Sequence, residues 1–304
     1  MYDAEAIVIG GGHNGLICAA YLAKAGVTTI LVEARDSVGG CASTVADMGA
    51  RFNICACDHS LIRAMPLIDE LNLSSHGLDY LEPEATYVNA FHENSGSWVF
   101  YHDSNQTMDG LSITHPSEVA NYKRYLEDAI PVAKLVIEIA QSGASMTEFL
   151  QVASRKRMKG VSKLLRWSKA SAVDVFKDYF DDWHLYMPGI STGPTVWGAP
   201  PEAPGTGLAA TVYATRHLIA SGRPRRGSGS LPDAILKSYL SHGGQVRLKS
   251  VVEKLQIENK RVKAVQLQDG SVIEAPTVIA ACDPHTVLVN WIDEAPVLSL
   301  IHIS

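Results

Sequence analysis

The sequence lacks the patterns that mark several classes of protein. Its five cysteines form no Cys-x-x-Cys pair, which argues against a dithiol reductase, and their odd number favours a reducing compartment over a disulfide framework. No apolar run reaches the roughly 18 residues that a membrane-spanning helix needs. The 11 histidines are scattered and never stand at metal-ligand spacing, so we expect no metal site.

Charge and composition narrow the class further. Lys and Arg number 26 against 32 Asp and Glu, a net charge of −6, which argues against a general nucleic-acid binder. Hydrophobic residues make up 46% and charged residues 19%, as in a globular protein with a substantial core. No charged segment followed by an apolar stretch stands at Met1, so we expect no signal peptide and a cytoplasmic location.

A glycine-rich turn between two regular patterns carries most of the information. Gly10, Gly12 and Gly15 form a Gly-x-Gly-x-x-Gly after the apolar run Ala6 to Ile9 and before a helical pattern. The first glycine permits a tight turn, the second lets the backbone approach a pyrophosphate, and the third allows close packing of helix on strand. Free N–H groups at the helix N-terminus attract the same pyrophosphate.

An acidic residue and a glycine pair complete the motif. Glu33 stands 18 residues after Gly15, at the end of a second predicted strand, where a carboxylate accepts hydrogen bonds from a ribose hydroxyl pair and disfavours NADP. Gly39 and Gly40 follow. The alternative is a glycine-rich turn that binds nothing, which would leave Glu33 and the glycine pair unexplained.

The run Glu33-x-Arg35-x-x-x-Gly39-Gly40 resembles the FAD-binding signature of glutathione-reductase-like flavoproteins. Within that group, GGGHNGL resembles the phytoene desaturase and carotenoid isomerase family, and most of all its branch called pyridine nucleotide-disulfide oxidoreductase domain-containing protein 2. The similarity continues through Phe52 to Leu81 and returns from Pro204 to Pro284.

The resemblance implies an FAD-dependent oxidoreductase. Its α/β fold would be a doubly wound, Rossmann-type FAD-binding domain (residues 1–80 and 216–304) with an inserted α+β substrate domain (81–215). Hydride would pass between a hydrophobic, isoprenoid or polyene-like substrate and flavin N5; the catalytic residues and the oligomeric state stay unassigned. Two alternatives remain open: a flavin amine oxidase acting on a C–N bond, and a non-catalytic FAD-stabilised interaction protein.

The resemblance also implies a set of cofactor-binding residues. Val252 would contact the adenine through its backbone, and Cys41 stands where many relatives carry arginine. The full set is Gly10, Gly12, His13, Asn14, Gly15, Glu33, Ala34, Arg35, Gly39, Gly40, Cys41 and Val252.

Local patterns predict further elements. Asn94-Ser95-Gly96 predicts a hairpin turn, and Pro116 opens a long helical pattern that Pro131 should kink or split. Residues 188–207 are rich in Pro and Gly and predict a loop or crossover. A helix from Leu231 with Ser230 as its N-cap precedes a β-meander with a turn at Asp269-Gly270.

Residues 155–169 hold seven basic residues and no acidic one, with Met158, Val161 and Leu165 on one helical face. This pattern is typical of an interfacial helix that contacts anionic lipid. The alternative is a solvated helix face in the substrate domain.

The resembled family continues well past the strand around Val278 to Pro284, with a further glycine-containing segment over the flavin ring. We therefore expect a C-terminally truncated fold that holds the adenosine half of FAD better than the flavin half. The apolar end, Leu298 to Ser304, has no partner strand in view.

Overall fold

The computed structural model describes residues 2–55, 59–92, 96–142, 145–155 and 159–292, and the expected hairpin tip at 94–95 and the end at 298–304 lie outside them. The chain forms two compact units. Unit 1 comprises Met1–Asp58, Leu67–Leu81 and Arg223–Ser304, and unit 2 comprises His59–Pro66 and Glu82–Gly222. The substrate domain was expected at 81–215. Unit 2 instead extends to Gly222, and it also includes His59–Pro66.

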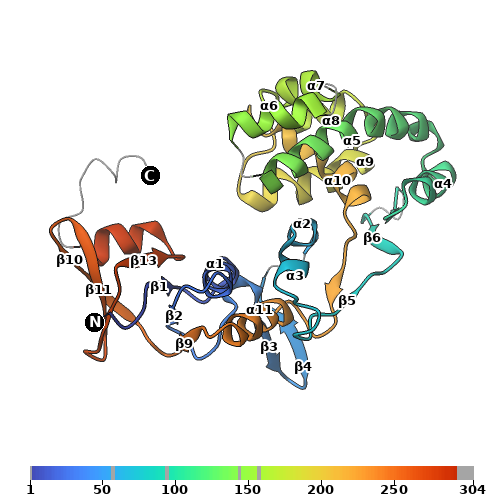
Figure 1. Cartoon of the computed structure of the whole chain (residues 1–304). Helices are drawn as coiled ribbons and strands as arrows, with labels where there is room; N and C mark the ends of the chain where they lie inside the picture. Colours follow the sequence, from blue (N-terminus) through green and yellow to red (C-terminus); the bar gives the residue numbers. More distant parts are fainter. Residues whose placement is uncertain (1, 56–58, 93–95, 143–144, 156–158, 293–304) are drawn as a thin grey trace. The chain divides into compact units, whose positions relative to one another are not determined.

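A parallel sheet forms the centre of unit 1, with the strand order β13-β1-β2-β9. Figure 1 shows that its blue and orange-red strands, far apart in the sequence, lie side by side. Every residue of β1 and β2 is buried, as their continuous apolar runs predict for strands covered on both faces. The sheet elements are β1 (Ala6–Ile9), β2 (Thr29–Val32), β9 (Gln245–Arg247) and β13 (Thr277–Ala280).

The two faces of this sheet have different partners. Ile9 and Val32 share a buried cluster with Val252, Leu255 and other side chains of an antiparallel meander. Side chains alternate along a strand, so the neighbouring positions point to the other face, where α1 contacts β1 and β2 and packs on α11. These elements are α1 (His13–Lys24), α11 (Ser230–Ser241), β10 (Val252–Glu258), β11 (Arg261–Leu267) and β12 (Val272–Glu274).

The smaller elements of unit 1 lie in its connections. The strands β5 and β8, at which the chain leaves and re-enters the unit, pair with each other. Gly229, not Ser230, is the N-cap of α11, because the helix begins one residue earlier than its apolar pattern. The remaining elements are η1 (Gly40–Ala42), β3 (Thr44–Asp47), β4 (Ala50–Asn53), α3 (Leu67–Glu70), β5 (Tyr80–Leu81), β8 (Arg223–Pro224) and the π-helical turn η5 (Thr286–Asn290).

Unit 2 is mainly helical around an aromatic core. Tyr122 and Tyr125 of the long helix α5 are fully buried against Phe100, Phe176 and Tyr213. The elements are α2 (Ser60–Ala64), β6 (Ala85–Asn89), β7 (Trp98–Tyr101), α4 (Ser104–Thr114), η2 (Pro116–Glu118), α5 (Val119–Ser142), α6 (Met146–Arg155), α7 (Val161–Trp167), α8 (Ala172–Lys177), α9 (Trp183–Thr192), η3 (Pro194–Trp197), η4 (Gly207–Thr211) and α10 (Val212–Leu218).

Two prolines lie inside helices of unit 2. Pro131 does not split α5, which runs unbroken through it. The prediction of a loop over 188–207 is wrong at its start, because α9 continues to Thr192 with Pro188 inside it. Pro188 has no N–H for the carbonyl of His184, and that carbonyl instead accepts the Trp98 indole N–H at 2.9 Å. A side-chain donor therefore replaces the missing helical bond.

Part of the apolar face expected in the basic segment 155–169 lies in the core. Val161, Leu164 and Trp167 of α7 are buried in the core of unit 2, and only Leu165 is exposed among the described apolar side chains of that helix. Met158 lies outside the described residues. The alternative, a helix of the substrate domain with a solvated basic face, fits these observations. Among the described residues, no helix is long and apolar enough to cross a bilayer.

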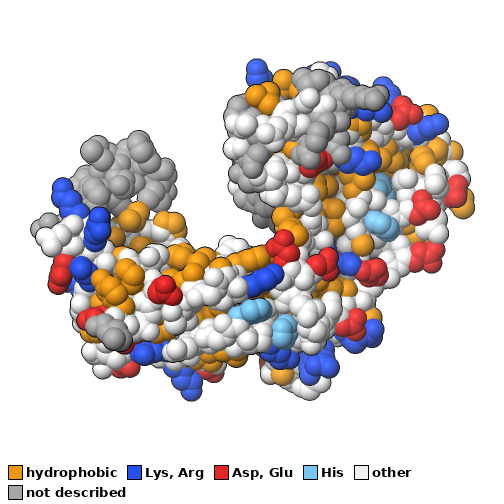
Figure 2. All heavy atoms as spheres, in the orientation of Figure 1, with side chains coloured by type: hydrophobic (Ala, Val, Ile, Leu, Met, Phe, Trp, Pro, Cys, Tyr) orange, Lys and Arg blue, Asp and Glu red, His pale blue; other side chains and the backbone are white. Residues whose placement is uncertain are grey.

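Charges of both signs are mixed over the surface. Figure 2 shows lysine and arginine side chains interspersed with aspartate and glutamate on the drawn face of each unit. Some of them pair, as Arg166 does with Asp178 on α7 and the turn after α8.

Tyr239 provides a test of the packing between α11 and the sheet. Its hydroxyl lies 2.6 Å from the Thr29 carbonyl and 2.7 Å from the Gln245 carbonyl, and accepts the Gln245 N–H at 3.0 Å. Tyr239→Phe should lower the free energy of unfolding by about 1–3 kcal/mol, because it leaves buried backbone groups without a partner. Urea denaturation measures this, with the exposed Tyr2→Phe as the control; equal stability of the two variants would contradict it.

Candidate functional site

The glycine turn lies where three parallel strands end. The Gly10 N–H donates to the Val32 carbonyl and the Ala281 N–H to the Ile9 carbonyl, both at 2.8 Å. Gly10 has φ +104°, and a Cβ there would lie 2.8 Å from the Ala281 carbonyl oxygen. A Cβ on Gly15 would lie 2.0 Å from the Gly10 oxygen. Glycine is therefore required at both positions by the protein's own backbone.

Gly12 is different, because the protein leaves room beside it. It is the N-cap of α1 with φ −68°, and the nearest atom to a Cβ built on it is the Gly40 Cα, at 3.9 Å. No side chain caps the helix and no acidic residue stands in its first turn, where His13 is half-buried and Asn14 exposed. The first-turn N–H groups thus face an open space suited to an anion, and a glycine there admits a pyrophosphate.

The Glu33 side chain is held by the backbone on both sides. Oε2 accepts the Gly11 N–H at 2.6 Å, and Oε1 accepts the Arg35 N–H at 2.9 Å. A Cβ on Gly11 would lie 2.9 Å from Oε2, so a glycine at this middle position of the Gly10–Gly12 run makes the contact possible. The Glu33 side chain is 12% exposed. Its remaining lone pairs are available to a pair of hydroxyl donors.

The second glycine pair lies directly against the first. The Gly39 N–H donates to the Gly11 carbonyl at 2.8 Å, and Gly12 and Gly39 form an isolated parallel bridge. Gly39 and Gly40 have φ of +126° and +55°, and a Cβ on Gly40 would lie 3.0 Å from the Gly12 Cα. The two glycine segments approach closely because neither carries a side chain there.

The remaining predicted residues surround this pair. Arg35 Nη2 donates to Ser43 Oγ at 3.1 Å, which connects the end of β2 to the turn after the second glycine pair. The Ser250 N–H donates to the Glu33 carbonyl at 2.9 Å, so the segment that leads to Val252 runs along the end of β2. Val252 itself is buried. Ala34 and Cys41 are exposed at the surface of the same region.

Two features were missed from the sequence. Gly11 has a defined role as the donor to Glu33. The sequence indicated this position only by placing a glycine where the Gly-x-Gly-x-x-Gly motif allows any residue. His115, Asp182 and His184 form a compact polar cluster in unit 2, although the histidines had been judged too scattered for a metal site. The Asp182-Trp-His184 triplet was its local signal, but His115 is distant in the sequence.

A family model described as flavin containing amine oxidoreductase matches residues 15–299. By sequence the chain is 24% identical to one of the subunits of the limonene dehydrogenase of Castellaniella defragrans, over 96% of this chain and 54% of that protein. It is 25% identical to pyridine nucleotide-disulfide oxidoreductase domain-containing protein 2 of Rattus norvegicus, over 93% and 54%. It is 28% identical to the lycopene-forming phytoene desaturase of Pantoea ananas, over 86% and 52%.

The chain thus spans about half the length of the curated relatives that it matches. Among solved structures, putrescine oxidase bound to putrescine aligns with a TM-score of 0.62 at 20% identity, over 95% of this chain and 60% of that one. An oxidoreductase from Methanosarcina mazei aligns with a TM-score of 0.60 at 16% identity, over 94% and 60%. These likenesses confirm the expected fold.

The glycines of the turn should differ in their effect on stability. Gly15→Ala should lower the free energy of unfolding by at least about 1–3 kcal/mol, because its Cβ meets the Gly10 oxygen. Gly12→Ala should change it by less than about 1 kcal/mol, since its φ suits alanine and its Cβ meets nothing closely. Denaturant unfolding of the ligand-free protein measures both. Equal destabilisation would show that the open space at Gly12 is absent in solution.

Proposed function

Because the chain belongs to the flavin containing amine oxidoreductase family, whose usual cofactor is FAD, we propose that its glycine turn binds the adenosine diphosphate part of FAD and serves an oxidoreductase. The observation that carries the proposal is the Glu33 carboxylate, oriented by the N–H groups of Gly11 and Arg35 beside an uncapped helix N-terminus. A carboxylate next to an anion site matches a ribose followed by a pyrophosphate.

Each part of the site has a role in this proposal. Glu33 accepts the ribose hydroxyls, and the first-turn N–H groups of α1, including those of His13 and Asn14, donate to the pyrophosphate. Gly12 and the Gly39-Gly40 pair let backbone and cofactor approach each other. The backbone at Val252 lies along the adenine, and Arg35 holds the turn that includes Cys41 in position through Ser43.

We further propose a hydrophobic substrate that exchanges a hydride with the flavin. Bound FAD supplies a hydride acceptor at N5, and the protein supplies position and a dry environment. The relatives named for limonene and phytoene chemistry support a hydrocarbon-like substrate and the making or breaking of a C=C bond. Contact with a membrane through residues 155–169 is not part of this proposal, because Val161, Leu164 and Trp167 lie in the core.

Oxidation of an amine is the second candidate. The description of the family favours it, since it names amine oxidoreductases. The two chemistries require different pockets, because a C–N bond next to a cation needs polar or aromatic walls, whereas an isoprenoid needs a long apolar cavity.

Removal of the Glu33 carboxylate tests the cofactor site. Glu33→Ala should weaken FAD binding by about 1.5–3 kcal/mol, the range for hydrogen bonds to a charged group. Gly12→Ala should also weaken it, by filling the space beside the pyrophosphate. The matched control is Asp36→Ala, which removes a nearby exposed carboxylate that accepts the Ser37 hydroxyl and no other described side chain. Fluorescence titration with FAD measures all of them. FAD affinity that is unchanged in Glu33→Ala would refute the assignment.

Anaerobic reduction of the flavin tests the reaction class. With FAD bound, an isoprenoid polyene or cyclic terpene should bleach the 450-nm region of the flavin spectrum, and a polyamine should not. Bleaching by the polyamine alone would establish the second candidate instead. Tight FAD binding without bleaching by either class would indicate an interaction protein that uses FAD for stability.

A further inference from the structure

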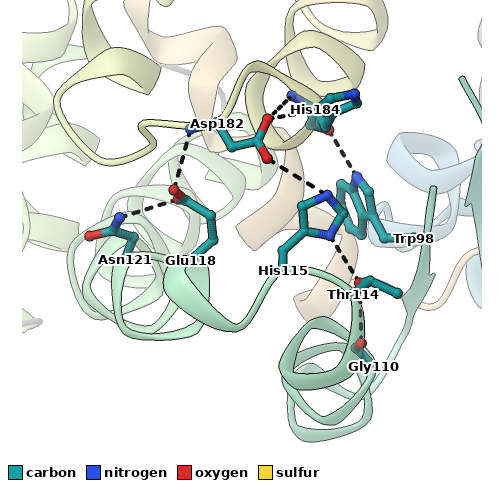
Figure 3. Close-up of polar contacts among 8 residues, drawn as sticks. All are labelled: Trp98, Gly110, Thr114, His115, Glu118, Asn121, Asp182 and His184. Atoms are coloured by element: carbon teal, nitrogen blue, oxygen red, sulfur yellow. Dashed lines mark hydrogen bonds and ion pairs between the residues drawn. The ribbon is translucent and has the colours of Figure 1, made fainter. Parts of the chain in front are cut away.

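A second polar cluster belongs to unit 2 and has no part in the FAD proposal. Figure 3 shows His115, between α4 and α5, facing Asp182 and His184 at the start of α9. One potential ligand atom from each of the three lies within 4.8 Å of the others. Asp182 Oδ1 lies 2.6 Å from His184 Nδ1, and its Oδ2 lies 3.8 Å from His115 Nε2.

The hydrogen bonds of Thr114 favour one tautomer of His115. His115 Nδ1 lies 2.9 Å from Thr114 Oγ1, and the Thr114 hydroxyl donates to the Gly110 carbonyl at 3.3 Å. With its proton used there, the Thr114 oxygen accepts from Nδ1–H. A neutral imidazole has a single N–H, so Nε2 carries a lone pair. The His115 side chain is 4% exposed, and Nε2 has no hydrogen-bond partner among the described residues.

Among the described residues, the only groups paired with the Asp182 carboxylate that can carry a positive charge are the two histidines of the cluster. The lone pair of His115 Nε2 faces the carboxylate of Asp182. A second carboxylate, Glu118, is 2% exposed and accepts the Asp182 N–H at 3.3 Å. Among the described residues, neither carboxylate pairs with a lysine or arginine.

Helix capping explains only part of this arrangement. Asp182 is the N-cap of α9, and its Oδ1 accepts the His184 N–H at 3.0 Å. That role uses Oδ1 and leaves Oδ2 facing His115. The Trp98 indole, bonded to the His184 carbonyl, holds this turn of the helix in place. Hydrogen bonds from Thr114 and Trp98 therefore hold the two sides of the cluster. His115 Nε2 and Asp182 Oδ2 face each other between them.

We propose that His115, Asp182 and His184 bind a divalent transition-metal ion, for which Zn²⁺ is the best match. Imidazole nitrogen and carboxylate oxygen are zinc ligands, and two ligands at about 2.0–2.1 Å from a tetrahedral ion lie roughly 3.3 Å apart. His115 Nε2 and Asp182 Oδ2, 3.8 Å apart, are near this spacing. His184 Nδ1 and Asp182 Oδ1 are hydrogen-bonded at 2.6 Å, so the ion would displace the proton between them. The Nδ1–H bond to Thr114 is the outer contact that zinc-binding histidines usually make. Three protein ligands leave the fourth position to water. The ion would tie the start of α5 to that of α9.

The test is a zinc titration of the full chain after treatment with a chelator. The wild type should bind one equivalent of Zn²⁺ with micromolar affinity or better, and Zn²⁺ should raise its unfolding temperature. Co²⁺ bound in the same site should show the intense visible bands of a tetrahedral ion. Absence of stoichiometric binding would overturn the proposal and identify the cluster as a helix cap with a buried histidine.

Two variants locate the ion. Asp182→Asn keeps an N-cap residue as good as aspartate, and His115→Asn keeps an amide donor near Thr114 while it removes Nε2. Each should weaken Zn²⁺ binding by more than about 100-fold, since even an outer-shell partner contributes roughly 10- to 100-fold. The control is His92→Asn, an exposed histidine of the same unit. Wild-type affinity in both cluster variants would place the ion elsewhere and refute the site. FAD affinity should be the same in all of them, so this result is independent of the flavin assignment.

Discussion

The hydrogen bond from the Gly11 N–H to the Glu33 carboxylate is the constraint on which the candidate cofactor site depends. It joins the turn after β1 to the end of β2 and, with the Arg35 N–H on the other oxygen, orients the carboxylate through backbone donors, while the Arg35 side chain lies 3.9 Å away. The Gly11 carbonyl in turn accepts the Gly39 N–H, so a single residue contacts both the acid and the second glycine pair. A side chain at Gly11 would displace Glu33, and one at Gly40 would press on Gly12. Glycine at these positions therefore allows the Glu33 carboxylate and the two glycine segments to lie close together.

In unit 2, side chains donate hydrogen bonds to backbone carbonyls at irregular points of the helices. The Trp98 indole satisfies the carbonyl that Pro188 leaves without a donor. The Tyr125 hydroxyl donates to the Ala210 carbonyl and the Tyr213 hydroxyl to the Leu185 carbonyl, each at 2.6 Å in the interior. An aromatic residue contributes apolar area and one polar atom together, so a core of tyrosines can accept irregular helix ends. Such a core is specific, because these two hydroxyls each donate to a defined backbone carbonyl.

The extent to which the structure followed from the sequence depended on how local each signal was. The turn at Gly10–Gly15, the buried strands and the meander are encoded within short segments, and the structure has them where the patterns predict. The loop expected over 188–207 was wrong at its start, where the distant Trp98 donates to the carbonyl that Pro188 leaves without a helical partner. For the basic segment 155–169, periodicity indicates an apolar face but not what covers it, and here the core covers Val161 and Trp167, while contact with a membrane stays a prediction. The cluster at His115 could not be seen, since two helix starts 67 residues apart meet only in three dimensions.

The parallel sheet of unit 1 has a consequence for how the chain folds. β1 pairs on one side with β2, its near neighbour, and on the other with β13, where Ala6 lies opposite Thr277 at a separation of 271 residues. The whole of unit 2 is synthesised between these partners, so the first strands emerge from the ribosome long before their sheet can be completed. Loop closure over such a length is slow, and an unpaired apolar strand is exposed to other chains in the meantime. The strands at which the chain leaves and re-enters unit 1, β5 and β8, pair with each other, so a folded unit 2 between them would shorten the loop that has to close.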